Sequence, residues 1–280
     1  MRITFRRALR TTWSLTPAVA GVTALAVVSV LIGRQLLPQA VLQRTSDAVG
    51  NYLQTLGGIY AVLLAFVTAA VWSQFNDARG YVAREAAAVV DVFRTVSGLS
   101  TERAAAVMAE LQEYVRAVID EEWQAMADDD DAIMERTGQK LDDVWLAIVA
   151  CEPKNSDSEL FGEVISRFNE LTELRTQRLT AARTQLPLAL RILLYAGAII
   201  VNLSMLLLYV ESIWIHMFMT GAMAACISHV LYVIVDLDDA FDGDWRVAPA
   251  AFLRAQRALA RLQSLASVIS LARGQAPHGA

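Results

Sequence analysis

Residues 48–76 read AVGNYLQTLGGIYAVLLAFVTAAVWSQFN, a run of 29 residues without Asp, Glu, Lys or Arg. A helix crosses about 30 Å of hydrocarbon with roughly 20 apolar residues, because each residue rises about 1.5 Å. The run therefore predicts a membrane-spanning helix. Since the run is longer than a bilayer requires, we expect this helix to tilt or to extend into the cytosol.

Three further stretches also lack charged residues, and they contain 19, 19 and 24 residues: Leu15–Gly33, Ile192–Val210 and Ser212–Val235. Each is long enough to cross a bilayer. In the whole chain of 280 residues, 55% are hydrophobic and 19% are charged, and the charged residues concentrate between the four stretches. This distribution excludes a disordered or disulfide-stapled protein. It predicts an all-α membrane protein with four transmembrane helices.

Arginines gather on one side of the predicted membrane, which is normally the cytoplasmic side. Four arginines precede the first span, whereas the connection between spans three and four contains only Glu211 as a charged residue. We therefore expect both termini in the cytoplasm. The predicted order is a cytoplasmic N-terminal tail at 1–14, spans one and two within 15–76, a cytoplasmic helical region at 77–190, spans three and four within 191–235, and a cytoplasmic tail at 236–280 with an acidic turn and an amphipathic helix.

The predicted cytoplasmic region holds 22 of the 29 acidic residues and 12 of the 24 basic ones, a net charge of −10. An acidic balance excludes the basic footprint of a nucleic-acid-binding protein. Four acids at 128–131 indicate a loop or a helix cap. Pro187 predicts a bend where a helix continues from this region into span three. Apolar residues recur every three or four positions, as in helices that bury one face against a partner; one stripe is Val82, Ala86, Val89, Phe93 and Val96.

Small residues recur every four positions in the second span, at Gly57, Ala61, Ala65 and Ala69. Small side chains let helix backbones approach closely, which favours helix association in lipid. Two interpretations stay open. This face packs against another helix of the same chain, or it packs between copies of the chain around a symmetry axis.

No set of residues predicts an enzyme. The sequence lacks Gly-x-Ser-x-Gly, His-Glu-x-x-His and the glycine-rich phosphate loops. Polar residues such as Asn202 and His216 lie within spans three and four, where polar side chains are costly and often functional. The predicted topology separates Cys151 from Cys226, so no disulfide is expected.

An acidic turn follows the fourth span. It does not match an EF-hand loop, because Ala240 and Pro249 occupy ligand positions when the loop begins at Asp238. Two interpretations stay open: a polar turn at the membrane exit, or a cation clasp completed by other loops. Calcium is the one candidate cofactor, and its candidate ligands are Asp238, Asp239, Asp242 and Asp244.

The order of four spans, a long helical insert and an acidic turn resembles the bestrophin architecture. The run Val71-Trp-Ser-Gln-Phe-Asn-Asp is similar to the bestrophin run Trp-Trp-Asn-Gln-Tyr-Glu-Asn, and the acidic turn is similar to the bestrophin calcium clasp. The chain resembles the bacterial bestrophin-like membrane family more closely, through Glu121-Glu-Trp, Phe241-Asp-Gly-Asp-Trp-Arg-Val-Ala-Pro and the motif residues Trp72, Gln74, Phe75, Asn76, Arg84 and Glu85.

Bestrophins are pentameric anion channels in which the second span lines the pore. The resemblance therefore implies a homo-oligomer, with a pentamer as the expected form, in the bacterial inner (plasma) membrane, with lipid, ions and further copies of the chain as partners. It places Gly58, Val62 and Phe66 on the pore face, where bestrophins carry phenylalanines, and Asp77 at the mouth. A hydrophobic constriction at Val62 and Phe66 fits a gate that closes by dewetting.

Ion selectivity stays open at this point. The resemblance implies anions, whereas Asp77 and the acidic insert favour cations if they face the pathway. A non-conducting receptor or scaffold, whose cytoplasmic helices bind a partner, is the alternative function.

Overall fold

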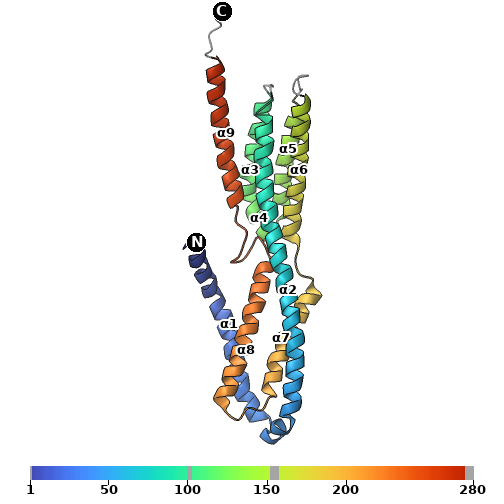
Figure 1. Ribbon diagram of the computed structural model, residues 1–280, viewed down its shortest axis with the longest axis vertical. Coiled ribbons are helices and arrows are strands. Elements are labelled where there is room, and N and C mark those ends of the chain that lie inside the picture. The colour runs from blue at the N-terminus through green and yellow to red at the C-terminus, as the bar shows by residue number, and fades with distance from the viewer. Residues whose placement is uncertain (1, 100–102, 152–157, 275–280) are drawn as a thin grey trace, which may run out of the picture. The chain divides into compact units, whose positions relative to one another are not determined.

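The structure, a computed structural model, describes residues 2–99, 103–151 and 158–274, and the side chains from 16 to 264 within these ranges. No strand occurs in this part of the chain, so the predicted all-α class is confirmed. The elements, shown in Figure 1, are α1 (Arg2–Leu36), α2 (Gln39–Val96), α3 (Ala104–Ala117), the π-helical turn η1 (Val118–Glu122), α4 (Trp123–Asp128), α5 (Asp131–Val149), α6 (Ser158–Arg183), α7 (Leu188–Leu206), α8 (Ile213–Asp238) and α9 (Ala250–Gly274).

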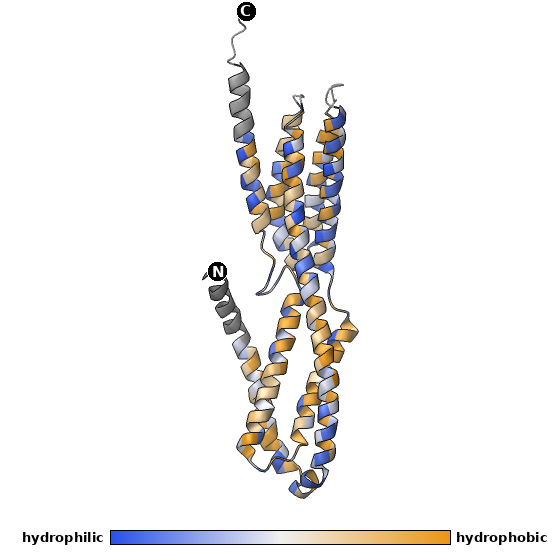
Figure 2. Ribbon diagram, in the orientation of Figure 1, coloured by the Kyte–Doolittle hydropathy of each residue, from blue (hydrophilic) through white to orange (hydrophobic). Residues whose placement is uncertain are grey.

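The chain divides into two compact units. The first contains Met1–Gln74, Gln185–Asp239 and Gly243–Trp245, and the second contains the remainder. Four apolar helices long enough to cross a membrane occur in the described residues, within Thr16–Leu36, Gln39–Val96, Ser158–Leu206 and Ile213–Asp238. Figure 2 shows the hydrophobic colouring of α1, α7 and α8. The four predicted apolar helices are therefore present, whereas the orientation of the termini stays a prediction.

Two polar contacts fix helices of the first unit. The Tyr60 hydroxyl on α2 donates to the backbone carbonyl of Leu194 on α7, at 2.8 Å. Gly197 lies one turn further along α7, and the Tyr60 ring occupies the space that a Cβ would need there. At the connection between α7 and α8, the Arg34 guanidinium donates to the backbone carbonyls of Val210 and Glu211. Burial in an apolar environment requires such partners for the polar groups.

The second unit buries the apolar stripes that the sequence predicts. All five residues of the α2 stripe are buried, and so are the matching residues of α3 and η1, which are Val107, Leu111, Tyr114 and Val118. Trp123 packs edge-on against Phe241 and Phe252, with ring centroids 5.6 and 6.0 Å apart. Its indole N–H donates to the Val247 carbonyl at 3.1 Å. The core of this unit therefore combines residues of α2, α3, η1 and α4 with residues that follow α8 in the sequence.

Two local features test the sequence interpretation. Asp130 caps α5, since its carboxylate accepts the N–H groups of Ala132 and Ile133 at 3.0 and 3.2 Å, as the acidic run predicts. The helix expected to continue into span three is interrupted instead. α6 ends at Arg183, and α7 begins at Leu188 with Pro187 as its N-cap. Predictions that fall on residues 1, 100–102, 152–157 and 275–280 lie outside the described residues.

The close approach of Tyr60 predicts that Gly197→Ala destabilises the protein. The new Cβ would lie 2.5 and 2.6 Å from two ring carbons of Tyr60, and the hydrogen bond to Leu194 opposes movement of the ring. Overpacking of this kind costs about 1–3 kcal/mol. We expect a lower melting temperature in detergent. Gly21→Ala is the matched control, because Gly21 has open space around it and alanine is the better helix former. Equal melting temperatures for both variants would show that the ring moves aside without cost.

Candidate functional site

One face of α2 is exposed in the first unit. Val62 and Phe66 are 57% and 72% exposed, and Gly58 is exposed with them. The opposite face is packed, since Tyr60, Val67 and Val71 are buried. Helical spacing therefore presents the predicted pore residues together, away from the protein core. Large exposed apolar residues on a membrane-spanning helix contact lipid, another protein or a passage.

The face of small residues is also largely uncovered in the single chain. Ala61, Ala65 and Ala69 are exposed, and Gly57 is half-buried. Packing against another helix of the same chain therefore does not occur at the three alanines. Association between copies through this face stays a prediction.

The family-motif residues at the end of the second predicted span occupy both exposed and buried positions. Trp72 and Asn76 are exposed, Gln74 is half-buried, and Phe75 is buried with the Arg79 guanidinium 5.9 Å from its ring centroid. Asp77 is exposed. Asp77 therefore lies on the exposed face of the helix, and Phe75 lies on the face that packs into the core.

Arg84 and Glu85 are neighbours in the sequence but have opposite environments. Arg84 is exposed, and its guanidinium lies 4.9 Å from the centroid of the Tyr81 ring. Glu85 is fully buried. The sequence identifies both as motif residues, and the structure gives them separate roles.

Glu85 belongs to a buried network of charges centred on Arg178 of α6. The Arg178 side chain binds both Glu85 oxygens, through Nε at 2.6 Å and Nη2 at 3.1 Å. Its Nη2 also binds Glu122 at 2.6 Å. Arg175 binds the other Glu122 oxygen and donates to the Met134 carbonyl at 2.8 Å. The charges of Arg175 and Arg178 thus balance those of the two carboxylates. The side chains of Arg178, Glu85 and Glu122 are completely removed from water.

The surroundings keep Arg178 charged and Tyr114 protonated. Burial by itself lowers the pKa of Arg178, but the adjacent Glu85 and Glu122 carboxylates raise that pKa well above its ordinary value. Burial, reinforced by Glu85, raises the pKa of the Tyr114 hydroxyl. Tyr114 therefore remains protonated and donates to Glu85 at 2.6 Å. The side chains of this network come from α2, α3, η1 and α6, and the Nε atom of Arg175 is the one of its buried polar atoms without a hydrogen-bond partner among the described residues.

Sequence reasoning missed Arg178, which it counted only among the 12 basic residues of the region 77–190. A signal was present. Arg178 continues the spacing of Leu171 and Leu174 on the buried face of α6, and an arginine at a core position requires acidic partners. The π-helical turn that carries Glu122 has no such signal. π-helical turns are short interruptions of α-helices that often occur where function needs a displaced side chain.

The acidic turn is held mainly by contacts within the protein. Asp238 is buried and accepts the Leu186 N–H and the Arg191 guanidinium, each at 2.8 Å. The Asp236 carboxylate accepts the N–H groups of Asp244 and Trp245. Gly243, with a φ of 79°, allows the tight approach to Asp236.

These contacts favour the polar turn. Among the described residues, no group of three or more His, Cys, Asp and Glu is arranged to hold a metal ion. As they lie here, Asp238, Asp239, Asp242 and Asp244 do not fit a calcium site. Calcium binding stays a prediction.

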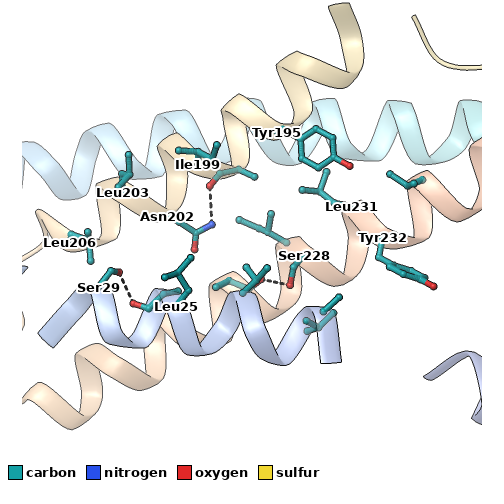
Figure 3. Close-up of a pocket in the computed structure, with 18 residues that line it drawn as sticks. Leu25, Ser29, Tyr195, Ile199, Asn202, Leu203, Leu206, Ser228, Leu231 and Tyr232 are labelled. Atoms are coloured by element: carbon teal, nitrogen blue, oxygen red, sulfur yellow. Dashed lines mark hydrogen bonds between the residues drawn. The ribbon is translucent and has the colours of Figure 1, made fainter. Parts of the chain in front are cut away.

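A cavity of about 600 Å³ lies between α1, α7 and α8 (Figure 3). Its few polar side chains bond to their own helices: Ser29 to the Ala26 carbonyl, Asn202 to the Ala198 carbonyl and Ser228 to the Ala224 carbonyl, at 2.7–2.8 Å. The remaining lining is mainly aliphatic, with Tyr195 and Tyr232 toward one end. The cavity therefore offers a mainly apolar surface.

Comparison with known proteins gives a family and a fold. The family model of the Bestrophin-like domain matches residues 20–252. No curated protein matches the sequence.

Crystal structures of a bacterial bestrophin homologue from Klebsiella pneumoniae are similar to this chain. A single-substitution variant has a TM-score of 0.67 at 16% identity, over 86% of this chain and 98% of the homologue. A second variant has a TM-score of 0.63 at 14% identity, over 88% and 97%. The structure phased with zinc has a TM-score of 0.61 at 15% identity, over 86% and 96%. At these identities the similarity shows the fold alone.

The buried network predicts that Arg178→Met strongly destabilises the second unit. Glu85 would stay buried without its cation, and loss of one partner of a buried ion pair costs about 3–5 kcal/mol. Arg183→Met is the matched control, because Arg183 forms an exposed pair with Asp131 that is worth less than about 1 kcal/mol. Thermal unfolding in detergent measures both.

Tyr114→Phe provides a milder test if Arg178→Met yields no folded protein. It removes one hydrogen bond to Glu85, and an unsatisfied buried group costs about 1–3 kcal/mol. A melting temperature of Tyr114→Phe that is no lower than that of the control Arg183→Met would contradict a stabilising role for the network.

Proposed function

The chain belongs to the bestrophin-like family, and from that premise we propose that it forms a homo-oligomeric ion channel with α2 lining the passage. The observation that carries the proposal is the exposed face of α2, where Gly58, Val62 and Phe66 lie together on an apolar helix long enough to span a membrane. The family and the fold support a channel of the bestrophin type, and the lining by α2 follows from this face.

The composition of the exposed face distinguishes α2 from α7 and α8. α7 and α8 expose large residues such as Leu203, Trp214 and Phe218, which are typical of surfaces in contact with lipid tails. α2 exposes Gly58 and three alanines beside Val62 and Phe66. Small residues favour close packing of helices, so α2 is better suited than α7 or α8 to meet further copies of the chain.

The gate of the proposed channel is formed by Val62 and Phe66. One turn of helix separates them, so copies arranged around an axis would place two successive apolar rings in the passage. Such a constriction excludes water and ions until it widens. The pentamer of the bestrophins is the expected stoichiometry.

The cellular placement follows the arginine distribution. We place both termini and the region 77–190 in the cytoplasm, and the four apolar helices in the bacterial inner membrane. Ions pass between the two sides, and no nucleic acid takes part. A non-conducting receptor or scaffold is the alternative that the absence of any ion flux would favour.

Assembly is tested by Ala65→Leu. If the small face of α2 lies between copies, the larger side chain separates the helices and the native mass in detergent falls to that of a smaller species. Leu203→Ala on α7 is the control, because it changes an exposed apolar residue on a helix that we assign to lipid. A monomeric wild type, or an Ala65→Leu variant with the wild-type mass, would contradict packing through this face.

Conduction is tested by Phe66→Ala in liposomes. Removal of the ring widens and wets the constriction, so we expect ion leak to increase at least about tenfold, which corresponds to a barrier lowered by roughly 1.4 kcal/mol. Phe218→Ala is the matched control, because Phe218 is 75% exposed on α8, and its flux should equal the wild-type flux. Absence of flux in the wild type and in Phe66→Ala, across voltage, pH and calcium conditions, would exclude the channel.

A further inference from the structure

Arg84 and Glu85 have opposite charges, which cancel in a count over the sequence. In the structure only Arg84 is exposed. Glu85 is fully buried, and Arg178 and Tyr114 occupy its carboxylate oxygens. Arg84, about 100° around the helix from Glu85, is exposed. A buried and paired carboxylate contributes little field at the surface, so this part of α2 presents one net positive charge.

The position of Arg84 follows from helix geometry within the second unit. Asp77 and Arg84 are seven residues apart, nearly two full turns, so they share the exposed face of α2. Arg84 forms no ion pair among the described residues, and its stacking on Tyr81 holds the guanidinium in place. The groove between α2 and α9 is lined by Ala83, Ala87 and Arg94 but not by Arg84.

The other arginines of this segment do not have the same position. Arg94 is paired with Asp91 at 3.5 Å, which offsets its charge. Arg79 lies about 140° around the helix from Arg84, as five residues of an α-helix require. It is placed over Phe75. Arg84 is therefore the cation on the face that also carries Asp77.

We infer that Arg84 is a selectivity-determining residue that favours small inorganic anions in the passage. The inference rests on the proposed channel with α2 as its lining. Each copy would contribute one guanidinium, and copies around an axis would form a positive ring about 10 Å along the helix from the ring of Asp77. This distance exceeds the Debye length of about 8 Å at physiological salt. The two rings therefore act separately, Arg84 in favour of anions and Asp77 in favour of cations.

The test is the reversal potential of the full-length channel in a planar bilayer under a tenfold KCl gradient. Arg84→Gln should lower the chloride-to-potassium permeability ratio at least about threefold, and Arg84→Glu should lower it further. Arg84→Lys should keep the wild-type ratio. Asp77→Asn should raise the ratio. The comparison uses ratios between variants, so it does not depend on which ion the wild type prefers.

Arg79→Gln is the matched control, since it removes an equal charge from an exposed position away from the Asp77 face, and its ratio should equal that of the wild type. At about 1 M KCl the Debye length falls to about 3 Å, so the difference between wild type and Arg84→Gln should shrink. Equal shifts for Arg79→Gln and Arg84→Gln would reassign the effect to the general surface charge and overturn the inference.

The failures of the two proposals are distinguishable. Absence of current in the wild type overturns the channel and the inference with it. Currents whose reversal potential is unchanged by Arg84→Gln and Arg84→Glu overturn the inference and leave the channel intact. Loss of assembly or a lowered melting temperature in Arg84→Gln would also overturn it, because an exposed side chain that faces a passage is not needed for packing.

Discussion

The burial of Arg178 is the interaction on which the second unit depends. Removing a guanidinium from water is unfavourable unless carboxylates and hydrogen bonds compensate. Glu85 from α2 and Glu122 from η1 supply that compensation, and they do so only when both helices have one particular rotation relative to α6. The network therefore specifies the arrangement of the helices as well as their stability. With Glu85 in the core, Asp77 and Arg84, which lie about 80° and 100° around the helix from it, are exposed.

The first unit fixes α2 by a different contact. There the Tyr60 hydroxyl binds α7, and Gly197 leaves space for the ring. Burial of Val67 and Val71 extends the same packed face. Because a helix presents residues at about 100° intervals, this contact leaves Val62 and Phe66 exposed. Each unit thus holds α2 by a contact of its own, and the face of α2 that would line the proposed channel is exposed in both units.

The features that the sequence predicted correctly depend on hydropathy and spacing. The long apolar run, the buried stripes and the cap at Asp130 require only local information, and the family follows from local motifs. The network around Arg178 was not predicted, because it joins residues 93 and 56 positions apart. The interruption after Arg183 was not predicted either. There Asp238 accepts the N–H of Leu186 from a distant part of the chain, a tertiary contact that stabilises non-helical backbone before Pro187. Calcium binding at Asp238, Asp239, Asp242 and Asp244 stays a prediction, since metal geometry depends on ligands brought together in space.

Net charge is a poor guide to ion selectivity in a protein built this way. The region 77–190 carries a net charge of −10, but many of its acids, such as Glu163 and Glu170, lie on the exposed surface of α6. Charges beyond a Debye length are screened from an ion in the passage. The side chains on the exposed face of α2 therefore dominate the local field. In the proposed passage, the sign of that field depends on Asp77 and Arg84, which are both exposed on α2 in the second unit.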